Sequence, residues 1–141
     1  MTTEVASVGP EASAAEAARL MRDINAGVVP VCSPGRHVVG VVTDRDLALG
    51  VCAEDGKPSS VRVGDLMIRD LKTVGPEDTV EVVEEMMAMY RTSRVLVVDR
   101  DGDLLGVVSL SDVAADGGGE RAGETLRRLS ARPKRPGVPT T

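Results

Sequence analysis

The stretch GVVTDRD at residues 40–46 recurs as GVVSLSD at residues 106–112, which lie 66 positions further along the chain. The same offset relates VGPE at residues 8–11 to VGPE at residues 74–77, and no gap separates the two matches. Self-similarity at a fixed period is the sequence signature of a repeated structural unit. The chain is therefore predicted to contain two copies of one unit, the first of which spans about residues 8–48.

Each copy is predicted to run strand, helix, strand, strand, helix. The first helix begins at Ser13, which forms a capping-box pattern with Glu16, and the equivalent helix begins at Thr79. Two runs rich in β-branched residues across a Gly-containing turn indicate a hairpin in each copy. The residues expected to face the core recur at helical spacing. They are Ala14, Ala17, Ala18, Met21 and Ile24 in the first copy, and Val83, Met86, Met87 and Tyr90 in the second.

The predicted fold class is a mixed α/β (α+β) fold of two β-α-β-β-α motifs packed through their sheets. Each motif exposes one sheet face that its own helices cannot cover, so pairing the motifs buries both faces. The expected boundaries are residues 1–56 for the first motif, 57–70 for a linker with a lead-in helix, 71–116 for the second motif, and 117–141 for a flexible C-terminal tail with a possible short helix. Within the motifs, hairpin strands are expected at residues 28–32, 38–42, 95–98 and 104–108, and closing helices at 44–52 and 110–115.

Composition disfavours several classes of protein. The net charge of −5 argues against nonspecific binding to DNA or to an anionic membrane, and Tyr90 is the only aromatic platform for base stacking. No apolar run approaches the ~18 residues of a membrane span, and the first residues lack the layout of a signal peptide. Cys32 and Cys52 do not make a disulfide framework. A cytoplasmic protein that binds neither nucleic acid nor membrane is expected.

A catalytic role is not expected either. His37 is the only histidine, and it lies in a predicted hairpin turn. The sequence contains no Ser-His-Asp, HExxH, CxxC or P-loop pattern. Cys32, Cys52 and His37 lack the close spacing of metal ligands. The chain is therefore predicted to be no enzyme and to hold neither a metal nor a cofactor.

The strand-to-helix junctions carry the candidate binding residues. In the first junction Gly40 permits close approach of the backbone, Thr43 places a hydroxyl at the helix start, and Asp46 follows three residues later. A helix N-terminus attracts phosphate, to which Thr43 or Ser109 can add a hydroxyl, while Asp46 or Asp112 can accept both hydroxyls of a ribose. The same residues also fit plain N-capping. The junctions taken alone leave both interpretations open.

The order of elements and the two junctions resemble the cystathionine-β-synthase (CBS) domain, which occurs in tandem pairs. The resemblance covers about residues 5–116. It rests on the pattern Gly-apolar-apolar-Thr/Ser-x-x-Asp, matched twice, on INAGVVPV at residues 24–31, and on GDLM at residues 64–67. It implies two clefts related by a pseudo-twofold axis, each taking its Thr/Ser and Asp from one copy and its base pocket from the other. It further implies a regulatory ligand such as AMP, ADP or ATP, less often S-adenosylmethionine, and a homodimer formed through helices.

The two implied clefts differ in their side chains. The cleft centred on Asp46 would take an apolar slot, hydroxyls and two cations from the second copy, and Arg45 could add a third cation or remain a solvated helix residue. Those second-copy residues are Met67, Leu71, Lys72, Thr92, Ser93 and Arg94. The cleft with Ser109, Ser111 and Asp112 would face a wall without cations. That wall comprises Val5, Ala6, Ala26, Gly27 and Val28. Nucleotide is therefore expected at the Asp46 cleft.

Two functions from different classes remain open on the sequence. One is a nucleotide sensor that passes a conformational signal to a protein partner that the sequence does not identify. The other is a ligand-free dimerisation or interaction module in which the Thr, Ser and Asp residues at the junctions serve only as helix caps.

Overall fold

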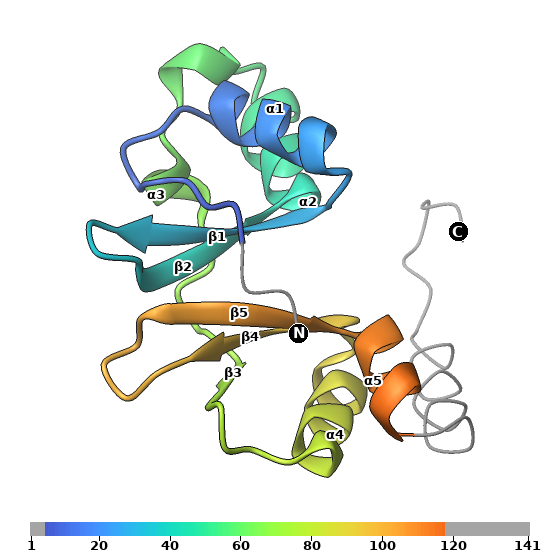
Figure 1. Ribbon diagram of the computed structural model, residues 1–141. Coiled ribbons are helices and arrows are strands. Elements are labelled where there is room, and N and C mark those ends of the chain that lie inside the picture. The colour runs from blue at the N-terminus through green and yellow to red at the C-terminus, as the bar shows by residue number, and fades with distance from the viewer. Residues whose placement is uncertain (1–4, 118–141) are drawn as a thin grey trace.

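The computed structural model describes residues 5–117 and arranges them in four layers (Figure 1). Two sheets form the middle layers, and the helices of each copy cover the outer face of that copy's sheet. The first copy comprises α1 (Ala14–Ile24), β1 (Val28–Ser33), β2 (His37–Thr43), α2 (Asp44–Leu47) and a π-helix, η1 (Ala48–Cys52). The second copy comprises β3 (Thr73–Val74), α4 (Val80–Tyr90), β4 (Arg94–Val98), β5 (Leu104–Ser109) and α5 (Leu110–Gly117). A 3₁₀ turn, η2 (Pro58–Ser60), and a short helix, α3 (Val63–Leu66), connect the copies.

The predicted mixed α/β fold with two repeated motifs is confirmed. Two details differ from the prediction. The first strand of the first copy is reduced to a single parallel bridge between Val8 and Val31, where the second copy pairs Val74 with Val97 in β3 and β4. The closing helix of the first copy continues from α2 as a π-helix rather than as α-helix. The predicted tail and its possible helix lie outside the described residues from position 118 onward.

The caps of the long helices follow the sequence pattern, except that within residues 5–117 the Glu16 carboxylate does not complete the predicted capping box by accepting from the Ser13 N–H. The Ser13 hydroxyl accepts a hydrogen bond from the Glu16 N–H at 3.1 Å, and the Thr79 hydroxyl accepts one from the Val82 N–H at 3.3 Å. Each helix ends at a residue in the left-handed region, Asn25 in the first copy and Arg91 in the second. These local signals place equivalent helices at equivalent positions of both copies.

The predicted core-facing stripes are correct for most of their residues and wrong at Ala18, Ile24 and Tyr90. Ala17 and Met87 are fully buried, but Ala18 lies on the edge of the stripe and is exposed. Ile24 and Tyr90 are 44% and 46% exposed. Each is the last residue of its helix.

The two copies join at the tips of their hairpins. The Val38 N–H donates to the Gly102 carbonyl at 3.0 Å, and the Leu104 N–H donates to the Arg36 carbonyl at 2.8 Å. These four residues are equivalent in pairs, so the contact has pseudo-twofold symmetry. Behind it, Val38, Leu104 and Cys32 form a small buried cluster of their own. Each copy keeps a separate core between its sheet and its helices.

The segment that connects the copies packs on the first copy. Val63 is fully buried in the first core, and Ile68 exchanges two backbone hydrogen bonds with Val41, of 2.7 and 3.0 Å. A Cβ atom at Gly40 would lie 2.9 Å from the Ile68 carbonyl and 2.7 Å from the Met67 sulfur. The glycine of this junction therefore makes room for the connecting segment. None of the helices among the described residues is long and apolar enough to cross a membrane.

Candidate functional site

A pocket of about 580 Å³ lies between the two copies, within the ~300–1,000 Å³ typical of small-molecule sites. Most of its lining residues are equivalent in pairs at the repeat offset. The pairs are Val5 and Leu71, Ala6 and Lys72, Ile24 and Tyr90, Ala26 and Thr92, Val28 and Arg94, Pro30 and Leu96, and Val41 and Val107. Thr43, Ile68 and Asp70 complete the lining. The pocket therefore lies on the pseudo-twofold axis and joins wall residues that the sequence assigns to two separate clefts.

The two walls of this pocket differ in chemistry despite their equivalent backbones. The second copy contributes polar side chains, namely Lys72, Tyr90, Thr92 and Arg94. The equivalent residues of the first copy are apolar, namely Ala6, Ile24, Ala26 and Val28. A ligand with an apolar body and an anionic group would therefore find a matching surface on each side.

Lys72 is held in place on the polar wall. Its ammonium donates a hydrogen bond of 3.0 Å to Asp70 Oδ2 and stands 4.9 Å from the centre of the Tyr90 ring. The hydrogen bond to Asp70 raises the pKa of Lys72 above its ordinary value, so the ammonium stays charged at neutral pH. The interaction with Tyr90 adds the attraction of a cation for an aromatic face.

Arg94 is the second cation on this wall. Within residues 5–117 no side chain or carbonyl accepts a hydrogen bond from its guanidinium. The Thr92 hydroxyl donates to the Arg94 carbonyl at 2.9 Å, which orders the backbone where β4 begins. The five N–H donors of an unpaired guanidinium suit a phosphate or carboxylate ligand.

Thr43 brings a hydroxyl to the pocket from the first copy. Its oxygen accepts from the Asp46 N–H at 3.1 Å, while Asp46 Oδ2 accepts from the Thr43 N–H at 2.8 Å. This reciprocal pair is a capping box. Because a hydroxyl carries one donor besides its acceptor sites, Thr43 can still donate to a ligand.

The second junction repeats the capping box. The Ser109 N–H donates to Asp112 Oδ2 at 2.9 Å, and the Asp112 N–H donates to the Ser109 hydroxyl at 3.2 Å. The hydrogen bond from the Ser109 N–H lowers the pKa of Asp112 below its ordinary value. Helix capping is thus the role that the structure shows for both acids, and their binding of a ribose stays a prediction.

Five predicted site residues line the pocket, namely Thr43, Leu71, Lys72, Thr92 and Arg94. Seven do not line it, namely Arg45, Asp46, Met67, Ser93, Ser109, Ser111 and Asp112. Met67 instead packs against the first core, because the connecting segment lies on that copy. The Ser93 carbonyl accepts a hydrogen bond from the Leu110 N–H at 2.8 Å, and Arg45 and Ser111 face solvent.

Sequence reasoning missed several lining residues. The helical pattern predicts that Ile24 and Tyr90 face the core, and the predicted site does not include Ile68 and Asp70 of the connecting segment. One signal was available, because Asp70 directly precedes the predicted pair Leu71 and Lys72. The position of Ile24 and Tyr90 at the ends of their helices is a second signal, since the last turn of a helix often extends beyond the sheet.

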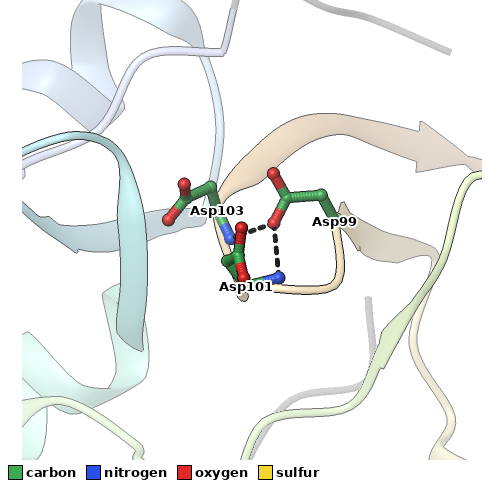
Figure 2. Close-up of side chains that lie close together, drawn as sticks. All are labelled: Asp99, Asp101 and Asp103. Atoms are coloured by element: carbon green, nitrogen blue, oxygen red, sulfur yellow. Dashed lines mark hydrogen bonds between the residues drawn. The ribbon is translucent and has the colours of Figure 1, made fainter.

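A second group of titratable side chains lies in the turn between β4 and β5 (Figure 2). Asp99, Asp101 and Asp103 each place one carboxylate oxygen within 4.8 Å of the other two. Asp99 Oδ1 accepts hydrogen bonds of 2.9 Å from the N–H groups of Asp101 and Asp103, as drawn in Figure 2. Such bonds are typical of an Asp that stabilises its own turn, so the cluster is explained by the hairpin.

Comparisons with known proteins agree with this architecture. The family described as CBS domain matches residues 1–51 and 63–116. The chain is 36% identical over 131 residues to the CBS domain-containing protein YhcV of Bacillus subtilis, covering 92% of this chain and 91% of that protein. It is 42% identical over 110 residues to inosine-5'-monophosphate dehydrogenase of Korarchaeum cryptofilum, covering 78% of this chain but 22% of that enzyme.

The fold is also similar to solved structures. A hexameric CBS-CP12 protein from bloom-forming cyanobacteria superposes with a TM-score of 0.66 at 30% identity, covering 82% of this chain and 67% of that one. The similarity therefore extends to the relative placement of both copies, the feature on which the pocket depends.

Proposed function

The chain belongs to the CBS-domain family as a tandem pair, a regulatory module, and we propose that it binds an adenine nucleotide between its two copies. The bound nucleotide would then change how the chain interacts with a protein partner. The observation that carries the proposal is the pocket of about 580 Å³ with one apolar and one cationic wall. A nucleotide has the matching parts, namely a flat aromatic base whose faces pack on apolar side chains and an anionic phosphate.

The contacts of such a nucleotide follow from the two walls. The base would pack against Ile24 and Val28, which belong to the apolar wall of the first copy. The phosphate would lie at Lys72 and Arg94, since charge-assisted hydrogen bonds to phosphate are stronger than hydrogen bonds between neutral groups. The Thr43 hydroxyl could donate to the same ligand. A ribose role of Asp46 would use Oδ1, because Oδ2 is engaged in the capping box.

A regulatory consequence follows from where the pocket lies. Its lining comes from both copies and from Ile68 and Asp70 of the connecting segment, so a bound ligand would stabilise one particular packing of the halves. A ligand shifts a conformational equilibrium only by the difference between its affinities for the two states. A nucleotide that bridges the two walls binds the closed packing more tightly than an open one, because separating the copies would break its contacts with one wall.

Isothermal titration with AMP, ADP, ATP and S-adenosylmethionine tests the proposal. We expect Arg94→Gln to weaken nucleotide binding by about tenfold or more, since hydrogen bonds to charged groups contribute about 1.5–3 kcal/mol. Arg100→Gln makes the same charge change in an exposed turn away from the pocket and should leave binding unchanged. No binding of any of these ligands at millimolar concentration would refute the proposal.

A second candidate function, a ligand-free interaction module, is favoured by the surface of α4. Met89 and Val82 are 66% and 39% exposed on this helix, and both junction acids already serve as caps. We propose that this face forms a homodimer contact, which Met89→Lys should weaken in sedimentation velocity experiments. If the chain forms this dimer but has no measurable affinity for nucleotides, the interaction module is favoured over the sensor.

A further inference from the structure

The charged side chains that line the pocket are two cations and one carboxylate, namely Lys72, Arg94 and Asp70. The carboxylate already bonds one of the cations, since Asp70 Oδ2 lies 3.0 Å from Lys72 Nζ. The pocket lining therefore carries a single net positive charge. Only the Arg94 guanidinium, among the described lining residues, is a cation without an acidic partner.

This balance limits how much negative charge the pocket can accept. One phosphate group carries about −1.5 to −2 charges at neutral pH, which is close to the combined charge of Arg94 and Lys72 but already exceeds the single net positive charge of the lining. A second or third phosphate would bring more charge without meeting another lining cation. It would also meet the carboxylate of Asp70, and like charges repel.

We propose that the pocket selects a nucleoside monophosphate over the di- and triphosphate, and that Asp70 is the residue that sets this preference. The inference rests on the proposed function, because it concerns the phosphate end of the same nucleotide. Asp70 acts by competing with the ligand for the Lys72 ammonium and by repelling additional phosphates. Lys72 keeps its position through Tyr90 when the phosphate takes over from the carboxylate.

The size of the effect follows from the exposure of the pair. The Asp70 and Lys72 side chains are 84% and 38% exposed, and solvent weakens ion pairs that are as exposed as this one. We therefore expect Asp70→Asn to raise the affinity for ATP, relative to that for AMP, by about two- to fivefold. Screening by salt should reduce the preference for AMP, because the Debye length falls to about 3 Å at 1 M salt.

The experiment is isothermal titration of the full chain with AMP, ADP and ATP in EDTA, so that no divalent cation neutralises the phosphates. The wild type should bind AMP most tightly, and Asp70→Asn should reduce the difference between the affinities for AMP and ATP. Asp101→Asn removes the same charge from the β4–β5 turn, outside the pocket lining, and should leave the AMP-to-ATP ratio unchanged. Circular dichroism checks that each variant is folded.

Three outcomes would overturn the inference while leaving the proposed function intact. The first is that the wild type binds ATP more tightly than AMP. The second is that Asp70→Asn leaves the ratio of the affinities for AMP and ATP unchanged. The third is that the preference for AMP persists unchanged in high salt. Absence of binding by all three nucleotides would instead refute the proposed function itself. Failure of the selectivity and failure of nucleotide binding are therefore distinguishable in the same titrations.

Discussion

The Nδ1 atom of His37 lies 3.3 Å from Oδ1 of Asp103, and the two residues hold the same position in the two copies, 66 residues apart. They form an isolated bridge where the hairpin tips meet, so the seam between the copies passes through a pair of equivalent residues. The pair is half-exposed. The backbone bonds and the buried cluster behind it therefore carry most of the stabilisation of the seam.

The half-exposed pair should contribute little to stability. Asp103→Asn should lower the free energy of unfolding by no more than about 1 kcal/mol, because solvent competes for polar contacts that are this exposed. Urea denaturation monitored by circular dichroism measures the difference, with Asp101→Asn in the same turn as the control. A loss above about 2 kcal/mol would mean that the pair is a principal link between the copies.

The buried cluster at the seam should contribute much more. Leu104 is 4% exposed in the cluster that joins the copies, and Leu104→Ala should lower the free energy of unfolding by about 2–5 kcal/mol because it leaves a cavity. Leu49→Ala, at a residue that is 50% exposed, should change it by less than about 0.5 kcal/mol. Equal losses in urea denaturation would contradict this assignment of the inter-copy core.

Substitution of the two capping hydroxyls should distinguish an effect on stability from an effect on nucleotide binding. Thr43→Ala and Ser109→Ala each remove an N-cap, and each should lower the free energy of unfolding by about 1 kcal/mol. Thr43 also lines the pocket and Ser109 does not, so only Thr43→Ala should weaken nucleotide binding as well. Thermal unfolding and calorimetric titration measure the two effects, and equal losses of affinity in both variants would contradict the asymmetry.

The pocket on the pseudo-twofold axis predicts one nucleotide per chain. The resemblance to tandem CBS pairs implied two clefts, but the walls expected for both contribute to one pocket, whose cations come from the second copy. The stoichiometry of the calorimetric titration should therefore be close to one. A value close to two would show that a nucleotide also binds outside this pocket.

The acid of the second junction should make stability depend on pH. Because the hydrogen bond from the Ser109 N–H lowers the pKa of Asp112 below its ordinary value of 3.8 in the folded state, the stabilisation is fully present above that value and is lost as the pH falls through the lower, folded-state pKa. Asp112→Asn should flatten the decline of unfolding free energy below about pH 4. Urea denaturation of the wild type and of Asp112→Asn at a series of pH values from 5 downward measures this dependence. An equally steep decline in the variant would contradict it.

Local sequence signals predicted much of the fold because the interactions behind them are local. The caps at Ser13 and Thr79 depend on residues three positions apart, and the hairpins depend on short turns between β-branched runs. The offset of 66 then transfers each element from one copy to the other. The site was predicted in part, since Lys72 and Arg94 line the pocket, whereas Asp46 and Met67 do not.

By itself, the sequence determined the duplicated unit, the order of its elements and the asymmetry that places the cations in the second copy. Only the tertiary structure decided that the walls of both expected clefts contribute to one pocket, that Ile24 and Tyr90 leave the core to line it, and that Asp70 lies beside Lys72. The physical reason is that a helical period or a cap depends on neighbours within one turn. A pocket depends on how two separately folded halves meet, and contacts between residues 66 positions apart leave no local pattern in the chain.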